Sequence, residues 1–171
     1  DVTPIGPDQT LAQMLADGEI DALHTARTPS TFYSRPDDVK RLFPDFVAAE
    51  KAYFRRTRIF PIMHVIAIRR SVYEANRWIA RSLFKAFCQA QAVTYHNLAV
   101  TSAMISMLPW QIAAVEEARA ELGDDWWPYG FERNRAVLDT FLRYHHEQGL
   151  SPRRLEPEAL FAPETFEAFK I

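Results

Sequence analysis

The sequence predicts an α/β protein whose C-terminal portion is rich in helices. One observation is the nearly continuous apolar run at 59–68, which is typical of a strand buried on both faces within a helix-covered sheet. A second is the segment 76–107, where apolar residues recur at spacings of three and four, as on a helix. A third is a short alternating segment at 19–24, which we interpret as another strand.

Two strands do not complete the sheet that the run at 59–68 requires. A strand that is apolar on both faces needs parallel neighbours, and right-handed crossover helices must connect them. The sequence also opens on Asp1 rather than Met. We therefore expect the chain to belong to a larger α/β protein whose remaining strands lie upstream.

Local patterns predict the other elements. Asp8 can cap a short helix that Gly18 closes, and the Pro- and Ser-containing segment 27–37 reads as a loop. A helix is expected over 46–57. Further helices are expected over 76–107, from Pro109 to Gly123 and over 131–148, with one or two short helices in the proline-containing tail.

Composition excludes several classes of protein. The 171 residues are 48% hydrophobic and 25% charged, with a formal net charge of -2, so nothing in the charge balance indicates nucleic-acid binding. No apolar run reaches the ~18 residues that a membrane-spanning helix needs. Cys88 is the single cysteine, which rules out a disulfide within the chain. Its helical surroundings favour a packed residue over a nucleophile.

His64 stands out because it interrupts the most apolar segment. The standard phosphate-binding, hydrolase and zinc motifs are absent, so isolated polar residues carry the functional argument. A buried imidazole must find a hydrogen-bond partner. His64 is therefore either a hydrogen-bonded core residue or an acid or base that faces a cleft.

His24, Arg27 and Thr28 lie at the end of the first predicted strand. Ligands of open α/β sheets bind outside the carboxyl ends of strands. The planar guanidinium of Arg27 suits a carboxylate, and the Thr28 hydroxyl can add a hydrogen bond. The alternative for each is a structural or solvated surface role.

An aromatic turn, Trp-Trp-Pro-Tyr-Gly at 126–130, precedes the last long helix. Trp127 and Tyr129 could line a site for a flat ring, since aromatic side chains stack on such ligands. The alternative is a packing hinge between helices.

Several motifs together resemble the 4,5-dihydroxyphthalate decarboxylase family. The most specific is Ile-Phe-Pro-Ile-Met-His at 59–64. Others occur along most of the chain, at 18–23, 26–29, 41–45, 126–130, 134–135 and 148–150.

This resemblance implies a periplasmic-binding-protein type II-like fold, in which two α/β lobes are joined by crossing segments and enclose a ligand. The chain would be the C-terminal half. Residues 1–57 would form the end of the second lobe and a crossing segment, and residues 58–171 would return to the first lobe with C-terminal helices. Arg58 stands where a glycine is expected before Ile-Phe-Pro, and a positive φ there would strain it.

The resemblance also implies an activity, the loss of one carboxylate from an aromatic dicarboxylate to give protocatechuate and CO2. His64 would be the proton donor, His24 would act at the ring hydroxyl and Arg27 would hold the retained carboxylate. Thr28, Trp127 and Tyr129 would complete the substrate site. No organic cofactor is required and no metal ligands are assigned, although a divalent metal is compatible with the scheme.

The expected partner is a small aromatic acid, and the sequence is also compatible with a homo-oligomer. Such an enzyme would be cytoplasmic. The alternative is a solute-binding protein, periplasmic in that case, which closes on a small organic or aromatic acid without changing it.

Overall fold

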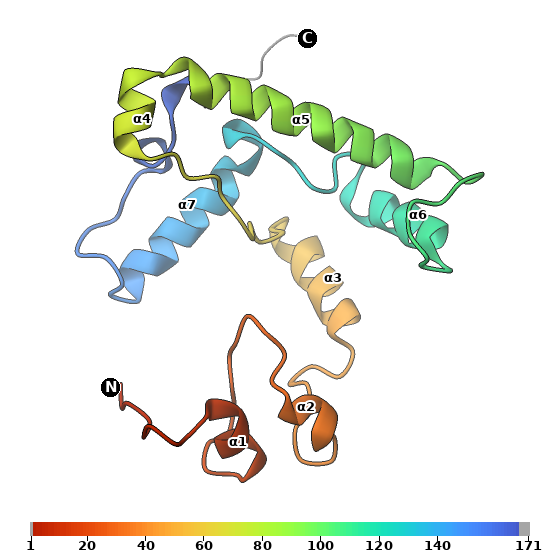
Figure 1. The fold of residues 1–171 in the computed structure, drawn as a ribbon, viewed down its shortest axis with the longest axis vertical. Helices are drawn as coiled ribbons and strands as arrows, with labels where there is room; N and C mark the ends of the chain where they lie inside the picture. The colour runs from red at the N-terminus through yellow and green to blue at the C-terminus, as the bar shows by residue number, and fades with distance from the viewer. Residues whose placement is uncertain (1, 168–171) are drawn as a thin grey trace. The chain divides into compact units, whose positions relative to one another are not determined.

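The computed structural model describes residues 2–167 (Figure 1). The chain divides into two compact units, an N-terminal unit of residues 1–55 and a C-terminal unit of residues 56–171. The helix α3 (Phe46–Thr57) runs across the boundary. Each unit is described by itself below.

The N-terminal unit is built on two short helices, α1 (Leu11–Ala16) and α2 (Thr31–Ser34). The Thr10 side chain caps α1 by accepting a hydrogen bond from the Gln13 backbone N–H, which satisfies one of the unpaired donors of the first turn. The predicted helix is thus confirmed, although its cap is Thr10 rather than Asp8.

A small core holds these helices together. Ala16, Thr31 and Val39 are buried, and the Thr31 hydroxyl donates to the Ala12 carbonyl at 3.0 Å. That bond ties α2 to α1. The structure therefore places a helical turn inside the predicted 27–37 loop, where four residues are too few to show a period.

The C-terminal unit consists mostly of helices, with the long α5 (Trp78–Ala99) as its main element (Figure 1). It packs against α6 (Gln111–Leu122) and the short 3-10 helix η2 (Pro163–Thr165). The other elements are α4 (Arg70–Ala75), α7 (Phe131–Glu147) and the 3-10 helix η1 (Pro157–Ala159).

The core of this unit lies along α7. Phe131, Leu138 and Leu142 are buried, and the Phe131 ring stacks on Phe166 with centroids 4.4 Å apart. Apolar residues at spacings of seven and four line one face of a helix. The predicted helix at 131–148 is thus confirmed, and so are those at 46–57 and after Pro109.

The α/β prediction is not supported within residues 2–167, because this part of the chain contains helices and no strand. Both predicted strands, at 19–24 and 59–68, have irregular backbone. The reason is physical: a strand exists only when a neighbour completes its hydrogen-bond ladder, and the described residues provide no such neighbour. What holds is the helix-rich character of the segment.

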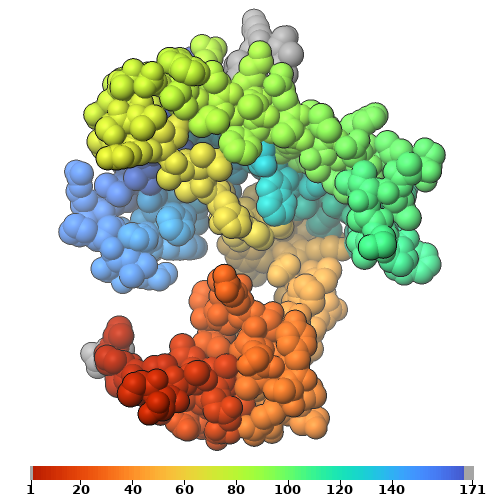
Figure 2. All heavy atoms as spheres, viewed as in Figure 1, coloured from red at the N-terminus to blue at the C-terminus, as the bar shows by residue number. Residues whose placement is uncertain are grey.

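The apolar run at 59–68 is accordingly exposed rather than buried. Val65 and Ile66 are 62% and 63% exposed, and Met63 is 59% exposed. Figure 2 shows yellow atoms of this region at the surface of the C-terminal unit. Arg58, directly before the run, has a φ of 57°, so the expected positive-φ turn is present with an arginine in it.

Candidate functional site

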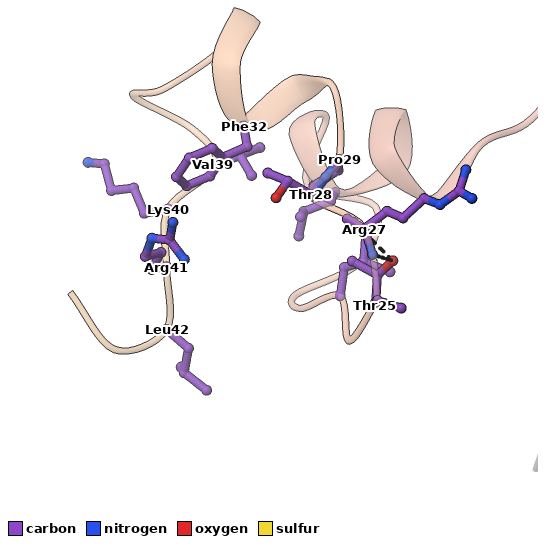
Figure 3. Close-up of a pocket in the computed structure, with 12 residues that line it drawn as sticks. Thr25, Arg27, Thr28, Pro29, Phe32, Val39, Lys40, Arg41 and Leu42 are labelled. Carbon is purple, nitrogen blue, oxygen red and sulfur yellow. Dashed lines mark hydrogen bonds between the residues drawn. The ribbon is translucent and has the colours of Figure 1, made fainter. Parts of the chain in front are cut away.

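The N-terminal unit contains a pocket of about 250 Å³ where the predicted residues Arg27 and Thr28 lie (Figure 3). This volume is below the roughly 300–1,000 Å³ typical of sites for drug-sized ligands, so the pocket suits a small molecule. Its walls combine cationic, hydroxyl and apolar side chains, contributed by Leu15, Leu23, Thr25, Ala26, Arg27, Thr28, Pro29, Phe32, Val39, Lys40, Arg41 and Leu42.

An ion-pair network links two segments of the N-terminal unit that contribute to the pocket. Arg35 contacts Asp17 at 2.5 Å and Asp38 at 2.8 Å, which joins the end of α1 to the segment after α2. Hydrogen bonds from the side chains of Gln13 and Arg35 lower the pKa of Asp17. The network thus holds together the two stretches of chain that line the pocket.

Arg27 lines the pocket, but its side chain does not point to the middle. Its backbone N–H donates to the Thr25 hydroxyl oxygen at 3.3 Å, and that hydroxyl donates to the Arg27 carbonyl at 3.1 Å. In Figure 3 the guanidinium of Arg27 extends away from Arg41, whereas Thr28 is directed toward Phe32 and Val39. His24 is exposed and is not part of the lining.

Arg41 is the functional candidate that sequence reasoning missed. Its guanidinium carbon lies 5.2 Å from the Phe32 ring centroid and 4.7 Å from that of Phe46. Each such cation–π contact at an exposed site contributes about 0.5–1 kcal/mol. The available signal was its place at the head of the Arg-Leu-Phe-Pro-Asp motif at 41–45.

His64 occupies an exposed position in the irregular segment after α3. The prediction that His64 lies in a buried central strand is therefore wrong for the described part of the chain. The reason is that no other strand is present there to pair with this segment. The hydrogen-bonded core role fails with it, because an exposed imidazole is solvated. Its role as an acid stays a prediction.

The aromatic turn at 126–130 is a packed junction. The Trp127 backbone N–H donates to the Tyr95 hydroxyl at 2.9 Å, and the Trp126 and Tyr95 rings lie 4.3 Å apart. Burial is the main reason that the pKa of Tyr95 is raised. The Asn134 amide donates to the carbonyls of Pro128 and Gly130 at 2.8 and 2.9 Å, which attaches the turn to α7.

Trp127 is nevertheless partly exposed, and its ring contacts the segment that carries His64. It is 42% exposed, and its ring lies 5.5 Å from that of Phe60 in an edge arrangement. Tyr129 is half-buried. The structure thus brings the aromatic turn and the start of the Ile-Phe-Pro-Ile-Met-His motif together within the C-terminal unit.

The predicted site residues fall into two groups. Arg27 and Thr28 share the pocket of the N-terminal unit, while His64, Trp127 and Tyr129 belong to the C-terminal unit. Cys88 is partly buried on α5, and burial raises the pKa of its thiol. A raised pKa reduces the thiolate fraction, as in an unreactive packed cysteine.

Comparison with known proteins supplies the deciding observation. The chain is 41% identical over 163 residues, or 95% of its length, to 4,5-dihydroxyphthalate decarboxylase from Comamonas testosteroni. The predicted family resemblance is confirmed. The chain spans about half of this curated relative, 49% of its length. No family model matches the sequence.

Within residues 2–167, no three His, Cys, Asp or Glu side chains gather closely enough to hold a metal ion. None of the helices in this described range has the length and apolar character to cross a membrane.

Proposed function

We propose that the protein containing this chain is a 4,5-dihydroxyphthalate decarboxylase. The observation that carries the proposal is the 41% identity over 163 residues to a protein of that name. The pocket of the N-terminal unit supports it, because cationic and apolar side chains together suit a small aromatic acid.

The reaction exchanges a proton for CO2 at one ring carbon. The hydroxyl para to the leaving carboxylate feeds electrons into the ring, and a donor protonates the carbon that bears that carboxylate. The C–C bond to the carboxylate then breaks, its electron pair restores aromaticity, and protocatechuate and CO2 are released. Such a site needs a proton donor, a base or dipole at the hydroxyl and a cation on the retained carboxylate.

Each predicted residue takes one of these roles. We propose His64 as the proton donor and His24 as the partner of the ring hydroxyl. Arg27 and Thr28 would bind the retained carboxylate. Trp127 and Tyr129 would contact the ring faces.

The scheme requires no organic cofactor. A divalent metal bound by histidine and by the catechol oxygens of the substrate would serve the same purpose as a dipole at the hydroxyl. We also propose the two-lobed periplasmic-binding-protein type II-like architecture. In it residues 1–57 end the second lobe and residues 58–171 return to the first.

Substitution of His64 tests the assignment. In the full-length protein, His64→Gln should abolish CO2 release from 4,5-dihydroxyphthalate and largely preserve its binding, because glutamine retains polar contacts but is no acid. His96→Gln is the matched control, since His96 is an exposed histidine on α5. Turnover by His64→Gln at the control's rate would refute the role of His64.

A further inference from the structure

Arg41 is one of the three cationic residues that line the pocket of the N-terminal unit, together with Arg27 and Lys40. It lines both this pocket and an adjoining hollow of about 340 Å³, whose other walls are mainly apolar. In Figure 3 its guanidinium lies beside Phe32 and Val39, whereas the ends of Lys40 and Arg27 extend outward in opposite directions.

Two rings hold this guanidinium in place. Phe32 and Phe46 contact it at 5.2 and 4.7 Å, so its planar group is oriented before any ligand arrives. Ordering a binding group in advance reduces the entropy lost on binding. A cation–π contact uses none of the N–H donors of a guanidinium, so those of Arg41 are left for another partner.

No carboxylate within the described residues takes up those donors. Arg35, by contrast, forms ion pairs with Asp17 and Asp38 in the same unit. Of these two arginines, one therefore serves the fold, and the other presents an oriented charge to a pocket.

The pocket surroundings define the ligand. A planar guanidinium matches a carboxylate through two parallel hydrogen bonds. Phe32 and Leu42 add apolar side chains to the same lining, and the Thr28 hydroxyl offers a further polar contact. A flat aromatic ring that carries a carboxylate can contact the apolar side chains with its ring and the polar side chains with its carboxylate.

We propose that Arg41 binds a carboxylate of the aromatic acid substrate and thereby sets the preference for a charged acid. This inference rests on the proposed function for the identity of the acid. It assigns a role to a cation of the pocket that the proposed function leaves unused.

The test measures binding of two unreactive probes, phthalate and its neutral analogue phthalamide, to the full-length protein. Arg41→Gln should weaken phthalate binding roughly tenfold to a hundredfold, the range of one charge-assisted contact, and should leave phthalamide binding unchanged. Arg41→Lys keeps the charge without the planar fork and should fall between. Arg81→Gln, on the exposed surface of α5, is the control.

Equal loss for both probes would mean that Arg41 only supports the pocket, and wild-type phthalate affinity in Arg41→Gln would mean that it does not contact the acid. Either result overturns the inference, as does a wild-type protein that binds no phthalate. CO2 release from 4,5-dihydroxyphthalate, measured alongside, separates the two claims. Arg41-dependent phthalate binding without CO2 release would sustain this inference and refute the proposed activity.

Discussion

Arg58 has a left-handed backbone conformation, with a φ of 57°, immediately before the Ile-Phe-Pro-Ile-Met-His motif. A side chain in this region suffers a clash between its Cβ and the following carbonyl, at a cost of about 1–2 kcal/mol. A glycine has no Cβ to clash. The strain at this residue therefore offers a direct measurement.

We predict that Arg58→Gly is more stable than Arg58→Ala by roughly 0.5–1 kcal/mol. Both variants remove the arginine side chain and its contacts, so their difference isolates the backbone. The relief of the Cβ clash exceeds the larger entropy that glycine has in the unfolded chain. Urea unfolding curves of the two variants check this, and an alanine variant as stable as the glycine variant would contradict it.

The residue scale also shows what sequence can and cannot reveal about the site. Arg27 and Thr28 were predicted to lie at a ligand site, and both line a pocket. Arg41 was missed because its contacts with Phe32 and Phe46 join residues nine and five positions apart, and no local pattern encodes such contacts. His64 was placed in a buried strand from apolar neighbours alone, and it is exposed.

Among the elements, α7 depends on a glycine at its start. Gly130 has a φ of 101°, and a Cβ there would lie 2.9 Å from Cζ of Phe84 on α5. Gly149, at the other end of α7, also has a positive φ, 74°, but nothing lies within 4 Å of its added Cβ. A Cβ at Gly130 would therefore meet both backbone strain and close packing, whereas a Cβ at Gly149 would meet backbone strain alone.

We predict that Gly149→Ala costs about 1 kcal/mol of unfolding free energy through backbone strain. Gly130→Ala should cost about 1–3 kcal/mol more, because the added methyl also overpacks the junction with α5. Thermal or urea denaturation measures both. Equal losses in the two variants would show that the contact with Phe84 does not constrain the turn.

The tail is tied to α4 by a hydrogen bond from the Tyr73 hydroxyl to Glu164 at 2.7 Å, with Arg77 3.6 Å from the same carboxylate. This hydrogen bond is the main cause that lowers the pKa of Glu164 and raises that of Tyr73. A lowered pKa in the folded state means that stability is present above the ordinary value of 4.5 and is lost as pH falls through the folded pKa.

Tyr73→Phe should therefore reduce stability most at neutral pH. The pKa of Tyr73 is raised in the folded state, so the hydrogen bond's contribution to stability is fully present below the ordinary pKa of 10.0. It is lost as the pH rises through the folded-state pKa of Tyr73. The difference from wild type should shrink at both the acidic and the alkaline end. Tyr33→Phe, on an exposed tyrosine of α2, is the control. A difference that is independent of pH would contradict this account.

The helices also show how far periodicity reaches. The bounds of α3 match the expected 46–57, because its apolar stripe is long enough to read. The four-residue α2 and six-residue α4 are too short for a period and were missed. The expected helix at 76–107 ends as α5 at Ala99, where Val100 turns extended, although apolar residues such as Met104 and Ile105 continue beyond it.

At the scale of the whole molecule, strands are harder to predict from a single segment than helices are. The run at 59–68 has the composition of a buried strand, yet its Val65 and Ile66 are exposed here. A helix makes its hydrogen bonds within itself, while a strand depends on a partner elsewhere in the chain. Helices could therefore be predicted from local sequence, and the sheet could not be realised without neighbours.

The exposed apolar run and the half-length match point to the same conclusion about activity. The chain spans about half the length of the decarboxylase that it matches, and we propose the reaction for the full-length protein, not for this chain alone. The predicted roles of His64 and His24 depend on that context, as does the expected two-lobed architecture.

CO2 release from 4,5-dihydroxyphthalate by the purified full-length protein, followed with and without a chelator, tests the central claim. We predict stoichiometric CO2 and protocatechuate, with His64→Gln inactive and His96→Gln active. Loss of activity with the chelator would add a divalent metal to the scheme. Tight binding of the acid without CO2 would contradict the decarboxylase assignment and favour a solute-binding protein.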